Sequence, residues 1–380
     1  MSLRRPTFFI SSRSHSADLL ASELVLALCD QYPKTEGIGI VGKWTARTRV
    51  APMGNLDELQ QASQAAGLEE GLKFLKEALL LNPPQIAILV GYSALHHELA
   101  GFFEQNQIPV VLYEVTPQEA LQGVNLEEAQ KRIKIALSIH KAGSAFIRAA
   151  QIPFHYIGTP YRDRVAKVLV KATAFDFLVD KPLVTLFPGG YGDALNKMIP
   201  LFGQFASGIL ASNDCQIVVS LREENDFDAT VSKMKQSLPP NAPVHFILGM
   251  HLELLSLSRL AICGSGAITI EAAILEKPFV PIFDVNSRAD SDGFHSLVNQ
   301  SLGRKLVEEY SDRTPLPEVL KNIQALLQDG PVRDAFIKNL GEAEQEFMGS
   351  AADNAADYIA GEVGLGRKKS KAAAPPVSAP

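Results

Sequence analysis

The sequence predicts an α/β protein of two domains, each built on a parallel β-sheet. Short runs rich in Val, Ile, Leu and Phe alternate with stretches long enough for helices, which is the pattern of βαβ units. The alternation starts afresh in the second half of the chain. At 380 residues, the chain is also too long for one ordinary core and suits two. We place the junction between residues 157 and 182, where Ile157-Gly158-Thr159-Pro160 is followed by a mixed stretch.

The individual elements follow from these runs. We predict strands at residues 7–10, 37–41, 86–90 and 110–115 and helices at 19–31, 68–80 and 126–139 in the first half, and strands at 183–187, 216–221, 244–248, 260–263 and 279–283 in the second. Residues 331–361 alternate apolar and charged positions at helical spacing, which predicts one or two long closing helices. Residues 366–380 combine basic residues with an Ala/Pro tract that cannot bury a core, so we predict a disordered tail, with weak attraction to anionic lipid as an option.

Composition excludes several classes of protein. The formal net charge of -6, without a basic stripe in the folded part, argues against a nucleic-acid binder. Three scattered cysteines show no metal-ligand spacing and suit buried free thiols in a reducing compartment. The apolar run near the N-terminus is too short for a signal peptide, and no window reaches the ~20 apolar residues of a spanning helix. We therefore expect a cytoplasmic protein whose membrane contact, if any, is peripheral.

The strongest chemical signal is a strand that enters a Gly-Ser-Gly turn and then an Ala-rich helix, over residues 260–273. Gly264 and Gly266 let the backbone approach a ligand, and the N–H groups of the helix start suit a diphosphate. Ser265 and Thr269 add hydroxyl donors. Glu271 suits hydrogen bonds from the vicinal hydroxyls of a ribose, or it is an ordinary first-turn glutamate stabilised by the helix dipole. Glycine turns that bind nothing also exist, so the pattern alone leaves both readings open.

Two further loops are candidates for the same ligand. Gly189 and Gly190 follow the first strand of the second domain, at the carboxyl end where open α/β sheets bind ligands, although a structural turn uses glycine equally well. Asn299 is placed to contact a base or a phosphate, or it is an ordinary polar loop residue.

In the first domain, His96 and His97 follow the strongest strand. Because adjacent side chains point in different directions, a shared metal is not expected. One of the two, with Glu98, is a candidate general base at neutral pH, and a histidine of the core or surface is the alternative.

Together these segments resemble the bacterial lipid-A-disaccharide synthase family, over about residues 8–360. Residues 156–160 look like its F-I-G junction, residues 186–190 like its L-L-P-G-S-R loop, and residues 260–271 like its A-S-G-T-A motif ending in L-E. Residues 296–309 resemble S-L-P-N-L-L-A-G-R-x-L-V-x-E in order and without a gap, which is the most specific match. Residues 351–357 look like the family's closing helix, which exchanges between the subunits of a dimer.

The resemblance implies a GT-B type fold: two Rossmann-like parallel-sheet domains that face a cleft, with closing C-terminal helices. It implies an acceptor domain over residues 1–160, a UDP-sugar donor domain over 161–345, a closing helix over 346–365 and the tail over 366–380. Ser16 and Asp18 match the family's acceptor-binding G-E-x-S-G-D loop, which otherwise departs from the pattern here. Ser93 and His96 stand where the family has aspartates, one of them a general base, so we assign them as the catalytic pair. Tyr191 replaces the arginine of P-G-S-R.

We therefore expect a divergent hexosyltransferase of lipid A biosynthesis that transfers a diacylglucosamine unit from UDP to an acylated glucosamine phosphate. The UDP diphosphate would rest on the turn at Gly264–Gly266, and neither a cofactor nor a metal is expected. Peripheral contact with the inner membrane and a homodimer remain open. The alternatives are a non-catalytic relative that binds a UDP-sugar or a partner protein, and another GT-B enzyme such as a UDP-sugar epimerase.

Overall fold

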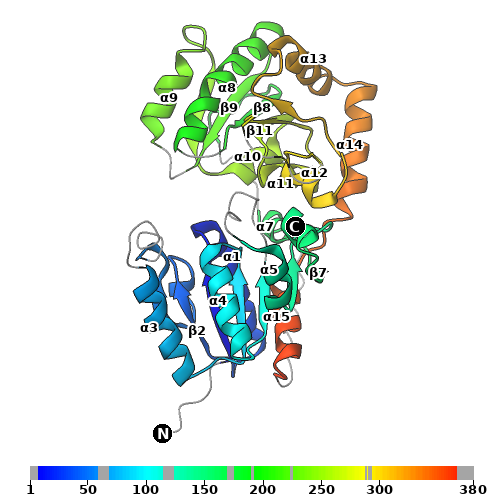
Figure 1. Ribbon diagram of the computed structural model, residues 1–380. Helices are drawn as coiled ribbons and strands as arrows, with labels where there is room; N and C mark the ends of the chain where they lie inside the picture. The colour runs from blue at the N-terminus through cyan, green and yellow to red at the C-terminus, as the bar shows by residue number, and fades with distance from the viewer. Residues whose placement is uncertain are drawn as a thin grey trace. The chain divides into compact units, whose positions relative to one another are not determined.

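The computed structural model describes residues 7–58, 68–113, 124–168, 175–189, 192–222, 226–286, 289 and 293–365. The chain divides into two compact units, each with its own parallel sheet (Figure 1). The first unit contains residues 1–160 and 350–380, and the second contains residues 161–349.

The first unit holds a seven-stranded sheet in the order β3-β2-β1-β4-β5-β6-β7 within the described residues, and every neighbouring pair is parallel. Its elements are β1 (Phe8–Ser12), α1 (His15–Gln31), β2 (Gly37–Val41), the 3-10 turn η1 (Thr45–Arg47), β3 (Val50–Asn55), α3 (Leu68–Leu81), β4 (Ile86–Val90), α4 (Ala94–Gln105), β5 (Val110–Tyr113), α5 (Leu126–Arg132), β6 (Ile135–Ser138), α6 (Ala145–Ala149), β7 (Phe154–Tyr156) and α15 (Ala351–Glu362).

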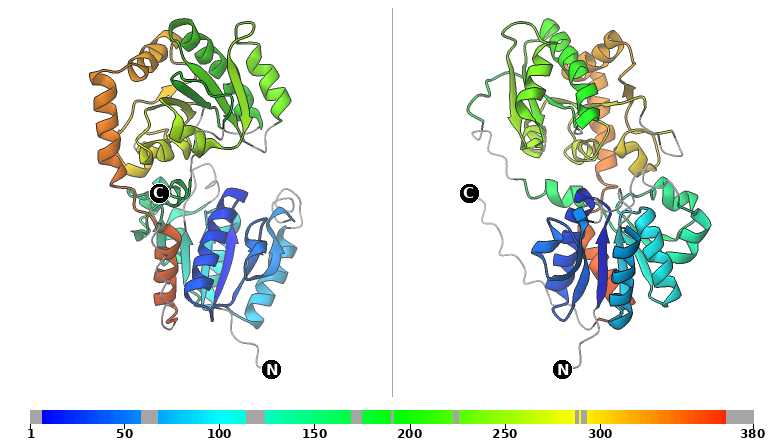
Figure 2. Two further views of the ribbon diagram at one scale, coloured as in Figure 1. Left: turned by 180° about the vertical axis from the view of Figure 1, so that it is seen from behind. Right: turned by 60° about the vertical axis from the view of Figure 1, so that its left-hand side comes forward.

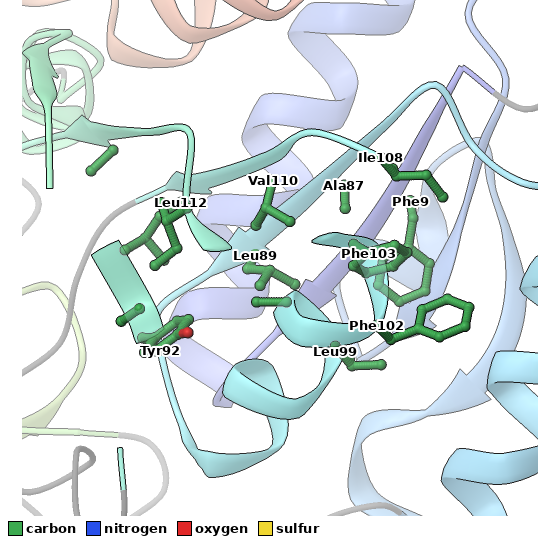
Figure 3. Close-up of a cluster of buried hydrophobic side chains, with 14 of the residues drawn as sticks. Phe9, Ala87, Leu89, Tyr92, Leu99, Phe102, Phe103, Ile108, Val110 and Leu112 are labelled. Carbon is green, nitrogen blue, oxygen red and sulfur yellow. The ribbon is translucent and has the colours of Figure 1, made fainter. Parts of the chain in front are cut away.

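One face of this sheet is covered by α3, α4 and α5. Alternate residues of the central strands, Phe9 on β1 and Ala87 and Leu89 on β4, point into a core that includes Leu99 and Phe103 of α4 (Figure 3). The centroids of the Phe9 and Phe103 rings lie 5.2 Å apart. Side chains of a strand alternate between faces, so the remaining strand residues point to the opposite side.

The helix α15 returns from the far end of the chain to pack against α1 of the first unit (red in Figure 2). Gln31 Nε2 donates to Asp353 Oδ1 at 2.5 Å, and Tyr32 Oη donates to Asp357 Oδ1 at 2.9 Å. Asn354 Nδ2 donates to the carbonyl of Ile157 at 2.8 Å. The first unit is therefore built from both ends of the sequence.

The second unit holds a six-stranded sheet in the order β10-β9-β8-β11-β12-β13 within the described residues, again with parallel neighbours. Its elements are α7 (Pro160–Val165), which begins at the unit boundary, β8 (Leu183–Phe187), α8 (Gly192–Ser212), β9 (Gln216–Leu221), α9 (Phe227–Lys235), β10 (Val244–Leu248), α10 (His251–Leu257), β11 (Leu260–Gly264), α11 (Ile268–Ile274), β12 (Phe279–Phe283), α12 (Leu297–Leu302), β13 (Tyr310–Ser311), α13 (Leu316–Leu327) and α14 (Pro331–Glu344).

Both faces of the second sheet are buried at its middle strands, which explains why β11 and β12 are apolar along their length rather than alternating. Leu260 and Ile262 of β11 pack with α8 and α13 on one face. Ala261 and Cys263 of the same strand pack with α10, α11, α12 and α14 on the other.

The five strands predicted in the second half are all present, four of them with the predicted bounds. The helix predicted over residues 126–139 is confirmed only over residues 126–132, which form α5, and its second half is wrong. The chain leaves the helix at Ile133, whose φ of -100° and ψ of 116° are extended, and residues 135–138 form β6 instead. Burial of Ala136 and Leu137 between β5 and β7 outweighs the helical spacing of the apolar residues. The predicted tail lies outside the described residues.

Within the described part of the chain, no helix is long and apolar enough to cross a membrane. Cys29, Cys215 and Cys263 are free and buried. Burial raises the pKa of each thiol, that of Cys215 to about 11, which makes all three unreactive as nucleophiles near neutral pH.

Candidate functional site

The candidate site of the second unit lies at the centre of its sheet, where the strand order reverses. β8 pairs with β9 on one side and with β11 on the other. The connections that follow β8 and β11 therefore lead toward opposite edges of the sheet. In open α/β sheets, the crevice beyond the carboxyl ends of such a strand pair is where ligands bind. Residues 188–189 follow β8 and residues 265–266 follow β11, so both predicted glycine loops meet at this point.

The glycines of this turn leave room that a side chain would otherwise occupy. A Cβ atom on Gly264 would lie 3.2 Å from the carbonyl oxygen of Pro188, so glycine allows the two loops to approach each other. A Cβ atom on Gly266 would meet nothing within 4 Å, and Gly266 is exposed. Gly189 has a φ of 63°, in the left-handed region that favours glycine. Gly190 and Tyr191 lie outside the described residues.

The start of α11 faces the same space. Ala267 is its N-cap residue, and no side chain among the described residues caps it. The carbonyl oxygen of Ser265 accepts a hydrogen bond from the Leu297 N–H at 2.8 Å, which ties the turn to α12. The Thr269 hydroxyl donates to the carbonyl of Gly266 at 2.7 Å and accepts from the Val298 N–H at 3.1 Å. Thr269 is fully buried, so its hydroxyl supports the turn rather than offering a donor to a ligand.

Glu271 lies in the first turn of α11, with only 5% of its side chain exposed. Its Oε2 atom is 3.6 Å from Nε2 of His251, whose side chain is half exposed. His251 begins α10 directly after Met250, whose φ of 55° is left-handed. The carboxylate is near enough to Cys263 to add to the burial that raises the pKa of that thiol. Sequence reasoning missed His251, because the two residues of the pair are twenty positions apart and lie on different helices.

The side-chain amide of Asn299 forms hydrogen bonds within the protein. Its Nδ2 atom donates to the carbonyl of Val307 at 3.0 Å and to Glu309 Oε1 at 2.8 Å, and its Oδ1 atom accepts from the N–H groups of Leu306 and Val307. Glu309 also accepts from the backbone and hydroxyl of Ser296. These bonds use the amide group of Asn299 fully and leave nothing for a base or phosphate. Glu309, which sequence reasoning did not single out, anchors this network.

The first unit has a matching reversal of strand order, because β1 pairs with β2 on one side and with β4 on the other. Ser14 and Ser93 follow these two strands and serve as N-caps. The Ser14 hydroxyl oxygen accepts from the Ala17 N–H, and that of Ser93 accepts from the His96 N–H, each at 3.3 Å. Ser93, one of the two predicted catalytic residues, thus has a clear structural role at the start of α4.

His96, the predicted general base, is fully buried. Its Nδ1 atom lies 3.0 Å from the carbonyl oxygen of Gly91, and its Nε2 atom lies 3.0 Å from Oγ of Ser11. A carbonyl only accepts, so Nδ1 carries the proton and Nε2 accepts from the Ser11 hydroxyl. Burial lowers the pKa of His96 to about 4, and the positive charge of Arg13 adds to this lowering. These contacts fit a structural histidine better than a base that takes a proton from an acceptor.

His97 has different partners, as expected for its neighbouring position. Its Nδ1 atom lies 3.1 Å from Oη of Tyr92, and its Nε2 atom lies 3.1 Å from Glu128 and 2.8 Å from Arg132. Burial lowers the pKa of His97, and Arg132 lowers it further. Glu98 is paired instead with Lys76 at 3.6 Å.

Asp18, predicted to bind the acceptor, is fully buried. Its carboxylate accepts from the N–H groups of Gly42, Trp44 and Thr45 and from the Thr45 hydroxyl, at 2.5 to 3.4 Å. Asp18 therefore organises the turn after β2, and these bonds replace direct contact with a substrate. Ser16 lies in the first turn of α1, but its side chain is outside what the structure describes.

No group of three or more His, Cys, Asp or Glu side chains in the described ranges is placed to hold a metal ion.

The comparisons with known proteins decide the family. The model of the family described as Lipid-A-disaccharide synthetase matches residues 8–288. The chain belongs to this family. A lipid-A-disaccharide synthase from Solibacter usitatus is 26% identical over 362 residues, which cover 90% of this chain and 93% of that protein.

Solved structures support the fold. Staphylococcus aureus MnaA in a co-structure with UDP superposes with a TM-score of 0.67 at 14% identity, covering 95% of this chain and 98% of that one. Acinetobacter baumannii MurG superposes with a TM-score of 0.59 at 13% identity, covering 94% and 99%. This chain therefore has the GT-B fold of two Rossmann-like domains. Its family makes it a glycosyltransferase of lipid A biosynthesis.

Proposed function

We propose that this chain transfers a diacylglucosamine unit from UDP to an acylated glucosamine phosphate and releases UDP. The observation that supports this proposal is the open glycine turn at Gly264–Gly266. It lies at the reversal of strand order, with an uncapped helix start on one side and a buried carboxylate one turn further on. The family match and the UDP bound to the structural neighbour MnaA point to the same ligand.

In this proposal the nucleotide is held by the second unit. Backbone N–H groups of Gly266 and Ala267 face the diphosphate and offset part of its charge. Glu271 accepts hydrogen bonds from the ribose hydroxyls, and His251 holds one carboxylate oxygen in place. Gly189 lets the backbone after β8 approach the phosphates. Asn299 and Thr269 act indirectly, by fixing the loop and the turn.

The transfer step forms a bond between an acceptor hydroxyl oxygen and the anomeric carbon of the donor sugar, breaks the bond from that carbon to UDP, and removes one proton from the acceptor. His96 is the base that the sequence predicts for this proton. Its basic Nε2 atom is occupied by Ser11, so a proton would have to pass through the Ser11 hydroxyl. A base with a pKa near 4 drives that transfer weakly at neutral pH.

A second candidate function follows from this geometry, namely a member of the family that binds UDP-sugar without turning it over. The buried state of His96 and the capping role of Ser93 favour it. The family match favours transfer.

The experiment is UDP release by the purified chain, given UDP-diacylglucosamine with and without an acylated glucosamine phosphate acceptor. Release that requires the acceptor, with formation of a disaccharide, supports the transferase. UDP binding without release supports the binding protein and rejects the transferase. Release without an acceptor indicates hydrolysis or an epimerase-like reaction.

A further inference from the structure

A lysine and an aspartate of the second unit lie on either side of the strand that leads to the glycine turn. Lys197 belongs to the second turn of α8, which follows β8, and Asp284 comes directly after β12. In the sheet, β11 lies between β8 and β12. Nζ of Lys197 and Oδ2 of Asp284 are 3.9 Å apart, so this ion pair joins two segments that flank the carboxyl end of β11. The turn at Gly264–Gly266 begins at that end.

Asp284 is held in place by its neighbours. Its Oδ1 atom accepts hydrogen bonds from the backbone N–H and from Nδ2 of Asn286, each at 2.8 Å. The preceding ring, that of Phe283, stacks on His295 with the ring centroids 3.7 Å apart. The hydrogen bond from the Asn286 N–H lowers the pKa of Asp284, and the positive charge of Lys197 adds to this lowering. The carboxylate is therefore ionised at neutral pH, with Oδ2 turned to the lysine.

Lys197 is held less firmly than its partner. Leu195, Met198 and Ile199 are buried in the core and fix the first turns of α8. The Lys197 side chain, in contrast, is 62% exposed, and its distance to Asp284 is at the long end for an ion pair. Such a pair contributes little stability, because water screens it and a long side chain loses freedom in forming it. The ammonium group is therefore free to exchange Asp284 for a stronger anion without any movement of α8.

We propose that Lys197 binds the diphosphate of the nucleotide sugar and stabilises the negative charge that develops on UDP as the sugar leaves. This inference rests on the proposed function, in which the diphosphate lies on the turn at Gly264–Gly266. Backbone N–H groups offset part of the diphosphate charge there, and a cation from the adjoining helix offsets more. Asp284 keeps the ammonium group beside the turn before the nucleotide binds, and Nζ then passes to a phosphate oxygen.

The test compares UDP with uridine, which lacks the phosphates. Calorimetry on the full chain should show UDP binding about tenfold weaker in Lys197→Met than in the wild type, the low end for a charged hydrogen bond because this side chain is exposed. Methionine keeps the length of the side chain and removes only its charge. Uridine, measured by its competition with UDP, should bind both proteins equally. Lys197→Arg should keep most of the UDP affinity, since a guanidinium also binds phosphate.

The matched control is Lys338→Met on α14. Lys338 is also exposed and lies 3.9 Å from Glu342, so the substitution removes an equivalent ion pair from the same unit. This variant should bind UDP like the wild type.

Two results would overturn the role of Lys197. Equal UDP affinity in Lys197→Met and the wild type would show that the ammonium group does not reach the diphosphate. Equal losses for UDP and uridine would show that the substitution disturbs the site as a whole. Failure of the wild type to bind UDP is a distinct outcome, since it contradicts the proposed nucleotide site and this inference with it. Binding is measured without an acceptor, so absence of sugar transfer leaves the test unaffected.

Discussion

At the middle of the second sheet the backbone after Gly264 faces open space, whereas at the middle of the first sheet the polar side chains are bonded to their own protein. Gly266 has no neighbour where a Cβ would stand. In the first unit, Asp18 is engaged by a turn, Ser93 caps a helix and His96 is locked between a carbonyl and a hydroxyl. The same topology thus carries an open glycine turn in one unit and an internal polar network in the other.

The largest effect that separates the two units is expected from Asp18→Ala. It leaves three backbone N–H groups and one hydroxyl without their buried acceptor, which should lower the free energy of unfolding by about 3 kcal/mol. Urea denaturation measures this change, and UDP affinity should stay at the wild-type value. A soluble, fully stable variant would show that the carboxylate is not the centre of the turn.

The dependence of stability on pH should expose the buried histidines of the first unit. Burial lowers the pKa of His96 and of His140 from 6.5 to about 4. Each is neutral in the fold but takes up a proton when unfolded below pH 6.5, so its contribution is complete above pH 6.5 and is lost as pH falls toward 4. The loss is up to about 3 kcal/mol for each histidine. Urea midpoints between pH 7 and 4 should fall less steeply in His96→Asn than in the wild type.

In the second unit, Glu271→Gln should weaken UDP binding about thirtyfold, since a charged acceptor for the ribose hydroxyls contributes about 2 kcal/mol. Calorimetry with UDP measures the affinity, and Glu253→Gln on the neighbouring helix α10 is the matched control. Unchanged affinity in Glu271→Gln would remove this carboxylate from the site.

A smaller effect is expected from His251→Ala, about fivefold weaker UDP binding, because His251 holds Glu271 from a half-exposed position. The effect should vanish in a Glu271→Gln background, whereas additive losses would show that His251 contacts the nucleotide independently. His245→Ala, on the strand before α10, serves as the control.

The parts of the fold that sequence predicted best are buried on both faces. Strands such as residues 279–283 are continuous apolar runs because helices cover both sides of the sheet. Among the described strands, β3, β6, β7 and β13 were not predicted. Three of these are edge strands, and β6 lies beside the edge strand β7. An edge strand needs less burial, and β3 also contains Pro52, which has no backbone N–H to donate to a neighbouring strand.

For the site, sequence identified the glycine turn because backbone geometry dictates glycine there. It could not show that the Asn299 amide is used internally, since its partners Val307 and Glu309 are brought to it by a turn of the chain. The pairing of His251 with Glu271 was equally hidden, because it joins two helices across a strand. Which polar groups remain available to a ligand depends on tertiary contacts that periodicity does not encode.

The return of α15 to the first unit has a consequence for biogenesis. A ribosome that has finished residue 160 has not yet made Asp353, Asn354 and Asp357, which bond to Gln31, Ile157 and Tyr32. The second unit is one continuous stretch and can mature first, while the first unit is completed only after residues 350–365 have been made. Any expression clone meant to yield the first unit alone must therefore join residues 7–160 to residues 350–365.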